Sequence, residues 1–274
     1  MPDPYLLAQM TVLLAIIGAF AGVLAGLLGV GGGIVLVPAY FYAFTTLGYG
    51  GDALMQVCVA TSLATIIVTS MRSVLSHNKT GAVIWPILRG WAPGIMAGAV
   101  VGMLVVAQLR SSTLQLLFGL LAMTVGLYMA LGRSEWRLGH EMPSGLRRIA
   151  VSPVVGFLSV LMGVGGGGFG VPLMTLYGTA IHRAVATAAG FGLLIAAPAV
   201  LGFLLTPVEA SARPPGTVGS VNLAAFLLTI AMTLVTTPLG ARLAHSLDPV
   251  RLRRVFAVFL LLVAANMVRK ALGG

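Results

Sequence analysis

The chain has 274 residues, of which 58% are hydrophobic and only 8% are charged, and its mean hydropathy is +1.04. This composition excludes an ordinary soluble domain and predicts a protein that crosses a membrane several times. The formal net charge of +10 does not indicate nucleic-acid binding, because the Lys and Arg residues lie at the ends of apolar segments without interleaved aromatic residues. Such placement is typical of anchors beside anionic membrane lipids.

Ten apolar segments follow one another along the chain, five in each half. A helix needs about 20 residues to cross the hydrocarbon core of a bilayer. The segments are 6–28, 34–47, 53–76, 83–107 and 114–131, then 150–162, 169–180, 184–206, 221–244 and 255–268. The second segment of each half is too short to cross, which predicts a half-helix or a re-entrant arm. We therefore expect an all-α polytopic membrane protein with a first transmembrane repeat (1–131), a cytoplasmic linker (132–148) and a second repeat (149–274).

A glycine motif occurs once in each half, at the same place in the order of segments. Residues 29–33 read Gly-Val-Gly-Gly-Gly and are followed by Val37-Pro38, and residues 163–167 read the same and are followed by Val171-Pro172. Glycine is unfavourable inside a helix by about 1 kcal/mol relative to alanine. The motif therefore predicts a glycine-broken helical hairpin in each half, with a site between the two.

The distribution of Lys and Arg predicts the orientation in the membrane. Cytoplasmic loops carry an excess of these residues, and most of them fall on one side, including Arg147 and Arg148 in the linker. This places the linker in the cytoplasm and both termini on the outer side of the membrane. Because each half holds an odd number of segments, the second half begins on the opposite side, which predicts two inverted five-segment repeats.

Inverted repeats bring two broken helices together near the middle of the membrane, as in secondary transporters. The start of a helix carries a partial positive charge and unpaired backbone N–H groups, and glycine lets a ligand approach them. The predicted substrate-binding backbone consists of Gly31, Gly32, Gly33, Gly165, Gly166 and Gly167. Such backbone is tolerated in lipid only where it lines a cavity or is covered by protein.

The charge of the predicted ligand follows from the acidic residues. All six Asp and Glu residues fall in loops or at a terminus, whereas cation transporters usually hold a carboxylate within the membrane. This favours a small anionic substrate. Hydroxyl groups at Thr61, Ser62 and Thr187 are expected to assist the backbone, the first within a stripe that continues through Thr65 and Thr69. The alternative is that these hydroxyls bond back to their own helix or pack between helices.

Three cationic or titratable residues are candidates for attracting the anion, namely Arg72, His182 and Arg183. The alternative for each is a side chain that reaches the lipid interface. No cofactor and no metal site are expected, because the histidines lack paired spacing and Cys58 is the single cysteine.

These motifs resemble those of the sulfite exporter TauE/SafE family, the 4-toluene sulfonate uptake permeases. The resemblance rests on the glycine motifs, on Ala60-Thr61-Ser62-Leu63, on residues 219–222 and on residues 238–244. It implies an inner-membrane transporter of sulfite, of organosulfonates such as sulfoacetate or isethionate, or of related small anions. The second half departs from the first at Gly168 and Gly170, and at Ala188 where the first half has Ser62.

The other functions that the sequence suggests lack their context. The spacing Gly163-x-Gly165-x-x-Gly168 matches a dinucleotide fingerprint, but no predicted strand precedes it, and neither glycine run continues into the Lys-Ser or Lys-Thr of a phosphate loop. We therefore expect no enzyme, but an alternating-access transporter driven by a coupling ion, H⁺ or Na⁺. An anion channel is the alternative, and an intramembrane hydrolase would need a base beside Ser159.

Overall fold

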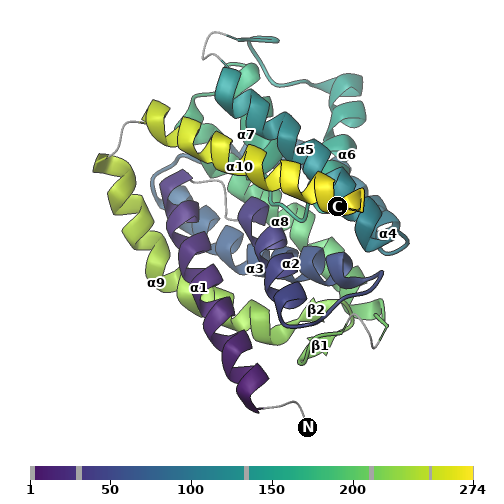
Figure 1. Ribbon diagram of the computed structural model, residues 1–274. Helices are drawn as coiled ribbons and strands as arrows, with labels where there is room; N and C mark the ends of the chain where they lie inside the picture. The colour runs from purple at the N-terminus through teal and green to yellow at the C-terminus, as the bar shows by residue number, and fades with distance from the viewer. Residues whose placement is uncertain (1–3, 29–32, 133–135, 210–212, 247–248, 274) are drawn as a thin grey trace.

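The computed structural model describes residues 4–28, 33–132, 136–209, 213–246 and 249–273, and within them the chain forms ten helices and one short hairpin (Figure 1). The first half contains α1 (Pro4–Leu28), α2 (Gly33–Thr46), α3 (Leu54–Lys79), α4 (Trp85–Val106) and α5 (Ser111–Leu131). The second half contains α6 (Gly145–Leu161), α7 (Gly167–Leu176), α8 (Ile181–Leu205), β1 (Thr217–Val218), β2 (Val221–Asn222), α9 (Leu223–Ser246) and α10 (Pro249–Ala271). Every predicted apolar segment corresponds to one of these helices, so the all-α fold class is confirmed.

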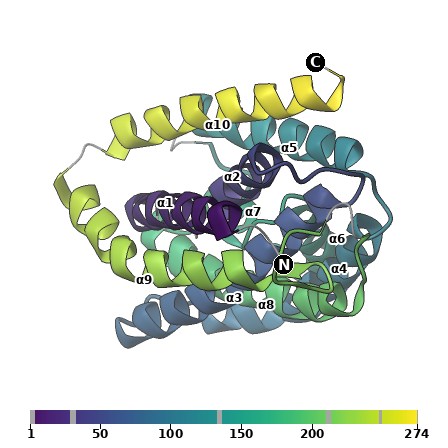
Figure 2. The ribbon, with the colours of Figure 1, turned by 60° about the horizontal axis from the view of Figure 1, so that its bottom comes forward.

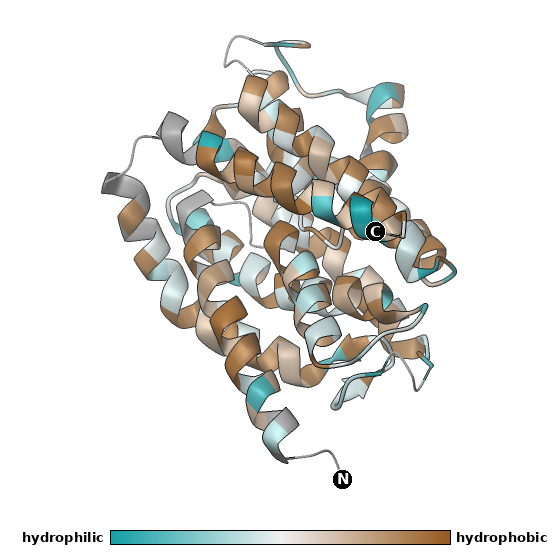
Figure 3. Cartoon of the chain, in the orientation of Figure 1, coloured by the Kyte–Doolittle hydropathy of each residue, from teal (hydrophilic) through white to brown (hydrophobic). Residues whose placement is uncertain are grey.

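Six of the described helices are long and apolar enough to cross a membrane: α1, α3, α4, α5, α8 and α9. Figure 3 shows apolar residues over most of the helical surface. By contrast, α2 has 14 residues and α7 has 10, which corresponds to a rise of about 21 and 15 Å. Both are shorter than the hydrocarbon core of about 30 Å, so the protein is a multi-pass membrane protein with two short helices placed as predicted.

The helices pack in pairs that repeat when each helix is replaced by the one five places along the chain. Helix α1 packs on α9 as α6 packs on α4, α2 packs on α3 as α7 packs on α8, and α4 packs on α8 as α9 packs on α3. Two further pairs, α3 with α8 and α5 with α10, join equivalent helices (Figures 1 and 2). The two halves are therefore interleaved rather than placed side by side as separate domains.

Glycine permits the closest of these helix contacts. A methyl group on Gly98 of α4 would overlap the backbone carbonyl of Pro153 in α6, and one on Gly240 of α9 would overlap the carbonyl of Val23 in α1. Small residues at helix crossings are the usual means of close packing in lipid, where water does not drive helices together. The same means is used at the equivalent crossing in each half.

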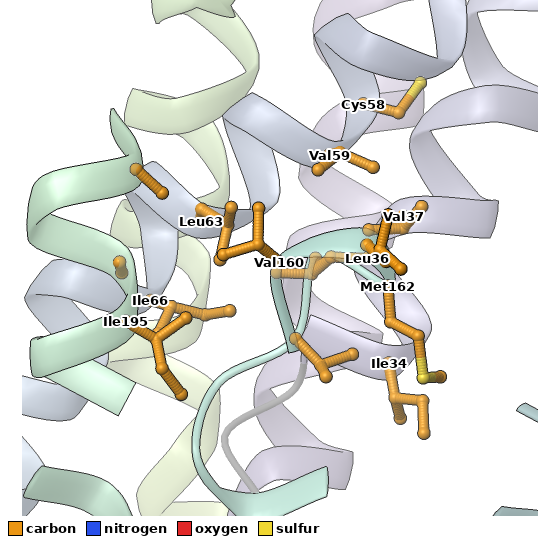
Figure 4. Close-up of a cluster of buried hydrophobic side chains, with 14 of the residues drawn as sticks. Ile34, Leu36, Val37, Cys58, Val59, Leu63, Ile66, Val160, Met162 and Ile195 are labelled. Atoms are coloured by element: carbon orange, nitrogen blue, oxygen red, sulfur yellow. The ribbon is translucent and has the colours of Figure 1, made fainter. Parts of the chain in front are cut away.

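Helix α3 is the most buried of the six helices that could cross a membrane, since 78% of its most apolar 18-residue stretch is buried inside the protein. Figure 4 shows its side chains Leu63 and Ile66 beside Val160 at the end of α6 and Ile195 of α8. The chain segment that follows α6 thus enters an apolar environment between α3 and α8. This is the segment that carries the second glycine motif.

Candidate functional site

The second glycine motif forms a tight turn between α6 and α7. Gly163 has a φ of +61°, its N–H donates to Val160 O at 2.9 Å, and the N–H of Val164 donates to Ser159 O at 2.9 Å. This paired arrangement is the Schellman motif, which ends a helix at a glycine in the left-handed conformation. The predicted break in the helix is therefore present, and Gly163 is the residue that makes it.

Three consecutive backbone N–H groups after this turn have no partner in the part of the chain that the structure describes. The N–H groups of Gly165, Gly166 and Gly167 make no hydrogen bond to any described residue, although residues 162–168 are all buried. Helix α7 begins at Gly167, so these donors also lie at the positive end of its dipole. Buried amide groups at a helix start form a site for a negatively charged group.

The first glycine motif is described only at its last residue, because Gly31 and Gly32 lie outside the described residues. Gly33 begins α2 and touches the second turn: a methyl group there would lie 3.1 Å from Gly163 O and 3.2 Å from Val164 Cα. Ser62 of α3 links the two, since its hydroxyl donates to Gly163 O at 2.8 Å and lies 3.5 Å from Gly33 O. The structure thus brings Gly33, Ser62 and the second glycine turn together.

Gly166 also packs closely against α8. A methyl group on Gly166 would overlap the backbone oxygen of Ala188 and lie 2.7 Å from the backbone nitrogen of Gly192. The lack of a side chain at Gly166 is therefore needed for the contact between the turn and α8. A bulky residue at this position is expected to disturb packing, which makes it a poor test of ligand binding alone.

Thr61 and Thr187 have equivalent roles in the two halves. Thr61 Oγ1 on α3 accepts the backbone N–H of Asn222 at 2.9 Å, immediately before α9, and Thr187 Oγ1 on α8 accepts that of Ile84 at 3.0 Å, immediately before α4. The start of α3 is therefore near the chain that follows α8, and the start of α8 is near the chain that follows α3. These contacts indicate that α3 and α8 run in opposite directions, while the inverted relation of the two halves and their orientation in a membrane stay predictions.

The hydroxyl stripe of α3 divides into two kinds of residue. Thr65 donates to Thr61 O at 3.0 Å, and Thr69 donates to Thr65 O at 3.2 Å, so both bond back to their own helix. For Thr65 and Thr69, the structure therefore shows the alternative given in the sequence analysis, in which the hydroxyl bonds back to its own helix. Thr61 and Ser62 instead bond to segments outside α3.

Two buried polar residues, Asn222 and Tyr40, hold helices together, and sequence reasoning did not predict this role for either of them. Asn222 is fully buried and caps α9, because its Oδ1 accepts the N–H of Ala225 at 2.8 Å while its Nδ2 donates to Thr217 Oγ1 at 2.9 Å. An Asn just before an apolar run is a helix-capping signal that was available. Tyr40 of α2 is also fully buried, and its hydroxyl donates to Thr229 Oγ1 of α9 at 2.8 Å.

The cationic candidates lie away from the glycine turn. Arg72 is exposed and lines an open groove of about 630 Å³ with Lys79 along the end of α3. It is ten residues beyond Ser62, or about 15 Å along the helix. His182 and Arg183 are exposed in the first turn of α8, before Thr187.

The described acidic residues lie between helices. Asp52, Glu141 and Glu209 are exposed in loops, and Asp52 pairs with Arg110 at 3.6 Å. Within the described part of the chain, no three His, Cys, Asp or Glu residues gather in a way that suits a metal ion. Ser159 is fully buried, and its hydroxyl has no hydrogen-bond partner among the described residues, so it is not paired with a base.

A polytopic helical fold with two short helices that begin at glycine motifs, and with buried amide donors at one of them, is an arrangement typical of membrane transporters. The family model of the sulfite exporter TauE/SafE matches residues 14–267. The chain therefore belongs to the sulfite exporter TauE/SafE family.

Curated relatives have similar lengths. A probable membrane transporter protein of Haemophilus influenzae is 31% identical over 255 residues, which cover 93% of this chain and 97% of that protein. One of Methanocaldococcus jannaschii is 26% identical over 88% of this chain and 89% of its own length. The probable membrane transporter protein YunE of Bacillus subtilis is 32% identical over 60% of this chain and 67% of its own length. No solved structure matches the chain.

Proposed function

We propose that the protein is a secondary transporter that moves a small sulfur-containing anion, such as sulfite, sulfoacetate or isethionate, across the inner membrane by alternating access. The observation that carries this proposal is the row of three buried N–H groups at Gly165, Gly166 and Gly167, which have no hydrogen-bond partner among the described residues. Family membership supports transport, and the family description names sulfite. The donors supply the charge preference, because a helix start attracts anions and repels cations.

The substrate would be held between the two glycine motifs. Gly33 and Ser62 adjoin the second turn and contribute to the same site, and Gly31 and Gly32 complete it in the proposal. Thr61 and Thr187 accept hydrogen bonds from the starts of α9 and α4, which leaves their own hydroxyl hydrogens available to an anion. Both threonines thereby connect the site to helices that would move when the halves rock.

The approach to the site would be cationic. Arg72, His182 and Arg183 are exposed at one end of α3 and of α8, where they would raise the local concentration of an anion. We place this end in the cytoplasm and both termini in the periplasm. Reporter fusions at the C-terminus, read on either side of the membrane, test that orientation.

The decisive experiment measures uptake into proteoliposomes. Radiolabelled sulfite, sulfoacetate, isethionate and taurine are offered to vesicles containing the purified protein, with and without imposed pH and sodium gradients. We expect saturable uptake of at least one anion, accelerated by one gradient and by unlabelled anion on the opposite side. The gradient that accelerates uptake identifies the coupling ion as H⁺ or Na⁺.

Matched controls separate transport from leakage. Empty vesicles report passive entry, and vesicles with Thr124→Val test nonspecific effects of a substitution, because Thr124 is exposed on α5 and its hydroxyl bonds to Leu120 O. Unsaturable currents without exchange across the membrane would identify an anion channel instead. Absence of uptake of every anion offered would contradict the proposed substrate class.

A further inference from the structure

Ser70 has an unusual environment for a hydroxyl group on a membrane helix. It lies on α3 two turns after Ser62, it is only 7% exposed, and its Oγ makes no hydrogen bond to a described residue. Thr65 and Thr69 on the same helix satisfy their hydroxyls by bonding back to backbone carbonyls, and Ser62 donates to Gly163 O. Ser70 is thus a largely buried residue whose hydroxyl has no hydrogen-bond partner among the described residues.

The Ser70 hydroxyl faces the second glycine turn across Gly192 of α8. A methyl group on Gly192 would overlap Ser70 Oγ and would lie 3.4 Å from the backbone nitrogen of Gly166. Gly192 Cα is itself 3.6 Å from the place where a methyl group on Gly165 would lie. The Ser70 hydroxyl and the N–H of Gly166, which has no partner among the described residues, therefore both lie close to Gly192, and they can do so because residue 192 has no side chain.

The equivalent position in the first half has a side chain. Because Thr61 and Thr187 occupy equivalent positions, Gly192 corresponds to Ile66 of α3. A methyl group on Gly33 would lie 2.7 Å from Ile66 Cδ1, so the isoleucine packs directly against the start of α2. Beside α7, polar groups thus approach a residue without a side chain, whereas the equivalent residue of α3 carries an apolar side chain, which packs against Gly33 and also reaches Gly165 of the second turn.

The two groups close to Gly192 are suited to a negatively charged oxygen. An N–H group can only donate, a serine hydroxyl can donate, and the start of α7 adds the partial positive charge of its dipole. Charge-assisted hydrogen bonds to an anion are stronger than those between neutral groups. The absence of a Cβ at Gly192 lets the two donors come close enough to act on one oxygen of a small oxyanion.

We infer that Ser70 Oγ and the N–H of Gly166 form an anion subsite beside Gly192, which holds one oxygen of a sulfite or sulfonate group. The inference rests on the proposed function, since it assigns a specificity-determining residue to that transport site. Ser70 binds the substrate directly, and Gly192 allows Ser70 Oγ and the N–H of Gly166 to approach the same oxygen. The site is consequently asymmetric, with the bound group nearer to α7 than to α2.

The test compares two single variants with a matched control. Ser70→Ala removes the hydroxyl without adding volume, and Gly192→Ala places a methyl group against Ser70 Oγ and beside the nitrogen of Gly166. Thr69→Val is the control, because it removes the adjacent hydroxyl, which bonds to Thr65 O and Ile66 O of its own helix. Affinity is measured from the rise in thermal unfolding temperature of the purified protein in detergent during titration with sodium sulfite and sodium methanesulfonate, with sodium gluconate keeping the ionic strength constant.

Ser70→Ala is expected to weaken binding of both anions about tenfold, which is the effect of one hydrogen bond to a charged group, with an unfolding temperature close to that of the wild type when no anion is added. Thr69→Val is expected to bind as the wild type does. Gly192→Ala is expected to lose measurable binding. The double variant Ser70→Ala, Gly192→Ala removes the overlap with Ser70 Oγ, so it should fold better than Gly192→Ala and still fail to bind.

Equal affinity of Ser70→Ala and the wild type would overturn the subsite, and so would a wild-type protein that neither anion stabilises. Uptake in proteoliposomes separates this result from the proposed function. Wild-type uptake that Ser70→Ala leaves unchanged in KM removes the subsite and keeps the transporter. Anion binding that depends on Ser70 without any wild-type uptake keeps the subsite and removes the transporter.

Discussion

The contact of α2 with α3 and α9 is polar at its centre, whereas the equivalent contact of α7 with α8 and α4 is apolar. In the first, Tyr40 OH donates to Thr229 Oγ1 at 2.8 Å and lies 3.5 Å from Thr65 Oγ1. All three residues are at least 99% buried, and they come from three different helices. They form a chain of hydroxyl groups that joins the two halves of the protein.

The equivalent residues in the second contact are Met174 for Tyr40, Phe191 for Thr65 and Trp91 for Thr229. These pairs follow from aligning the two glycine motifs, the two threonines Thr61 and Thr187, and the starts of α4 and α9. Each of the three is no more than 2% exposed, and the rings of Trp91 and Phe191 stack with centroids 6.2 Å apart. The two contacts thus share a backbone arrangement and differ completely in the side chains that hold it.

This difference indicates that the two halves do not serve the substrate equally. Stacked rings fix a contact through dispersion and shape, while hydroxyl groups exchange hydrogen-bond partners and permit alternative packings. Ser62 bonds to the second glycine turn, and its counterpart Ala188 has no hydroxyl to do the same for the first. We expect α7 to stay with α8 and α4 during transport and α2 to be the short helix that shifts.

The largest effect is expected from breaking the apolar contact. Trp91→Ala removes a side chain that is 2% exposed and stacked on Phe191, which should lower the free energy of unfolding by about 3–5 kcal/mol. Equilibrium unfolding in mixed detergent micelles measures this change. Trp136→Ala is the control, because Trp136 lies in the linker with 48% of its surface exposed. Equal losses of unfolding free energy in the two variants would show that the stacked contact does not stabilise the fold more than an exposed tryptophan does.

A smaller effect is expected from removing the paired threonine hydroxyls. Thr61→Val and Thr187→Val each leave a backbone N–H without its acceptor, buried at Asn222 and half-buried at Ile84, which should cost about 1–3 kcal/mol. Because the two sites lie at opposite ends of the α3–α8 pair, the losses should add in the double variant. The exposed site Thr124→Val serves as the control. A double variant no less stable than either single variant would show that the two hydrogen bonds do not act as independent, equivalent contacts.

Much of the fold could be predicted because its signals are local. Apolar length identifies the long helices, and repeated glycine identifies the breaks before α2 and α7. The Schellman turn at Gly163 follows from the same signal, since a glycine after an apolar run commonly ends a helix in the left-handed conformation. These features depend on residues that are close in sequence.

The partners of the polar residues could not be predicted, because they are distant in the chain. Thr229 lies 189 residues from Tyr40, and Asn222 lies 161 residues from Thr61. A hydroxyl on an apolar helix bonds either to its own backbone or to another helix, and only the packing decides which. Ser70 could not be singled out from the sequence for the same reason, because its proposed role depends on its contact with Gly192 on a different helix.

The smallest effect is expected from the polar contact itself, at Tyr40→Phe. The variant keeps the ring and its contact with Phe44, whose centroid is 6.2 Å away, and loses the hydrogen bond to Thr229. Thr229 can then bond to the carbonyl of Ala225 one turn earlier, so the loss should be about 1 kcal/mol. The control is Tyr42→Phe on the same helix, which removes a hydroxyl that accepts from Asn266 Nδ2 at 2.8 Å. Unfolding in mixed micelles gives the stability, and uptake gives the consequence for transport. A loss as large as that of Trp91→Ala would mean that hydroxyl groups hold α2 as firmly as stacked rings hold α7, and the expectation that α2 is the mobile helix would then be wrong.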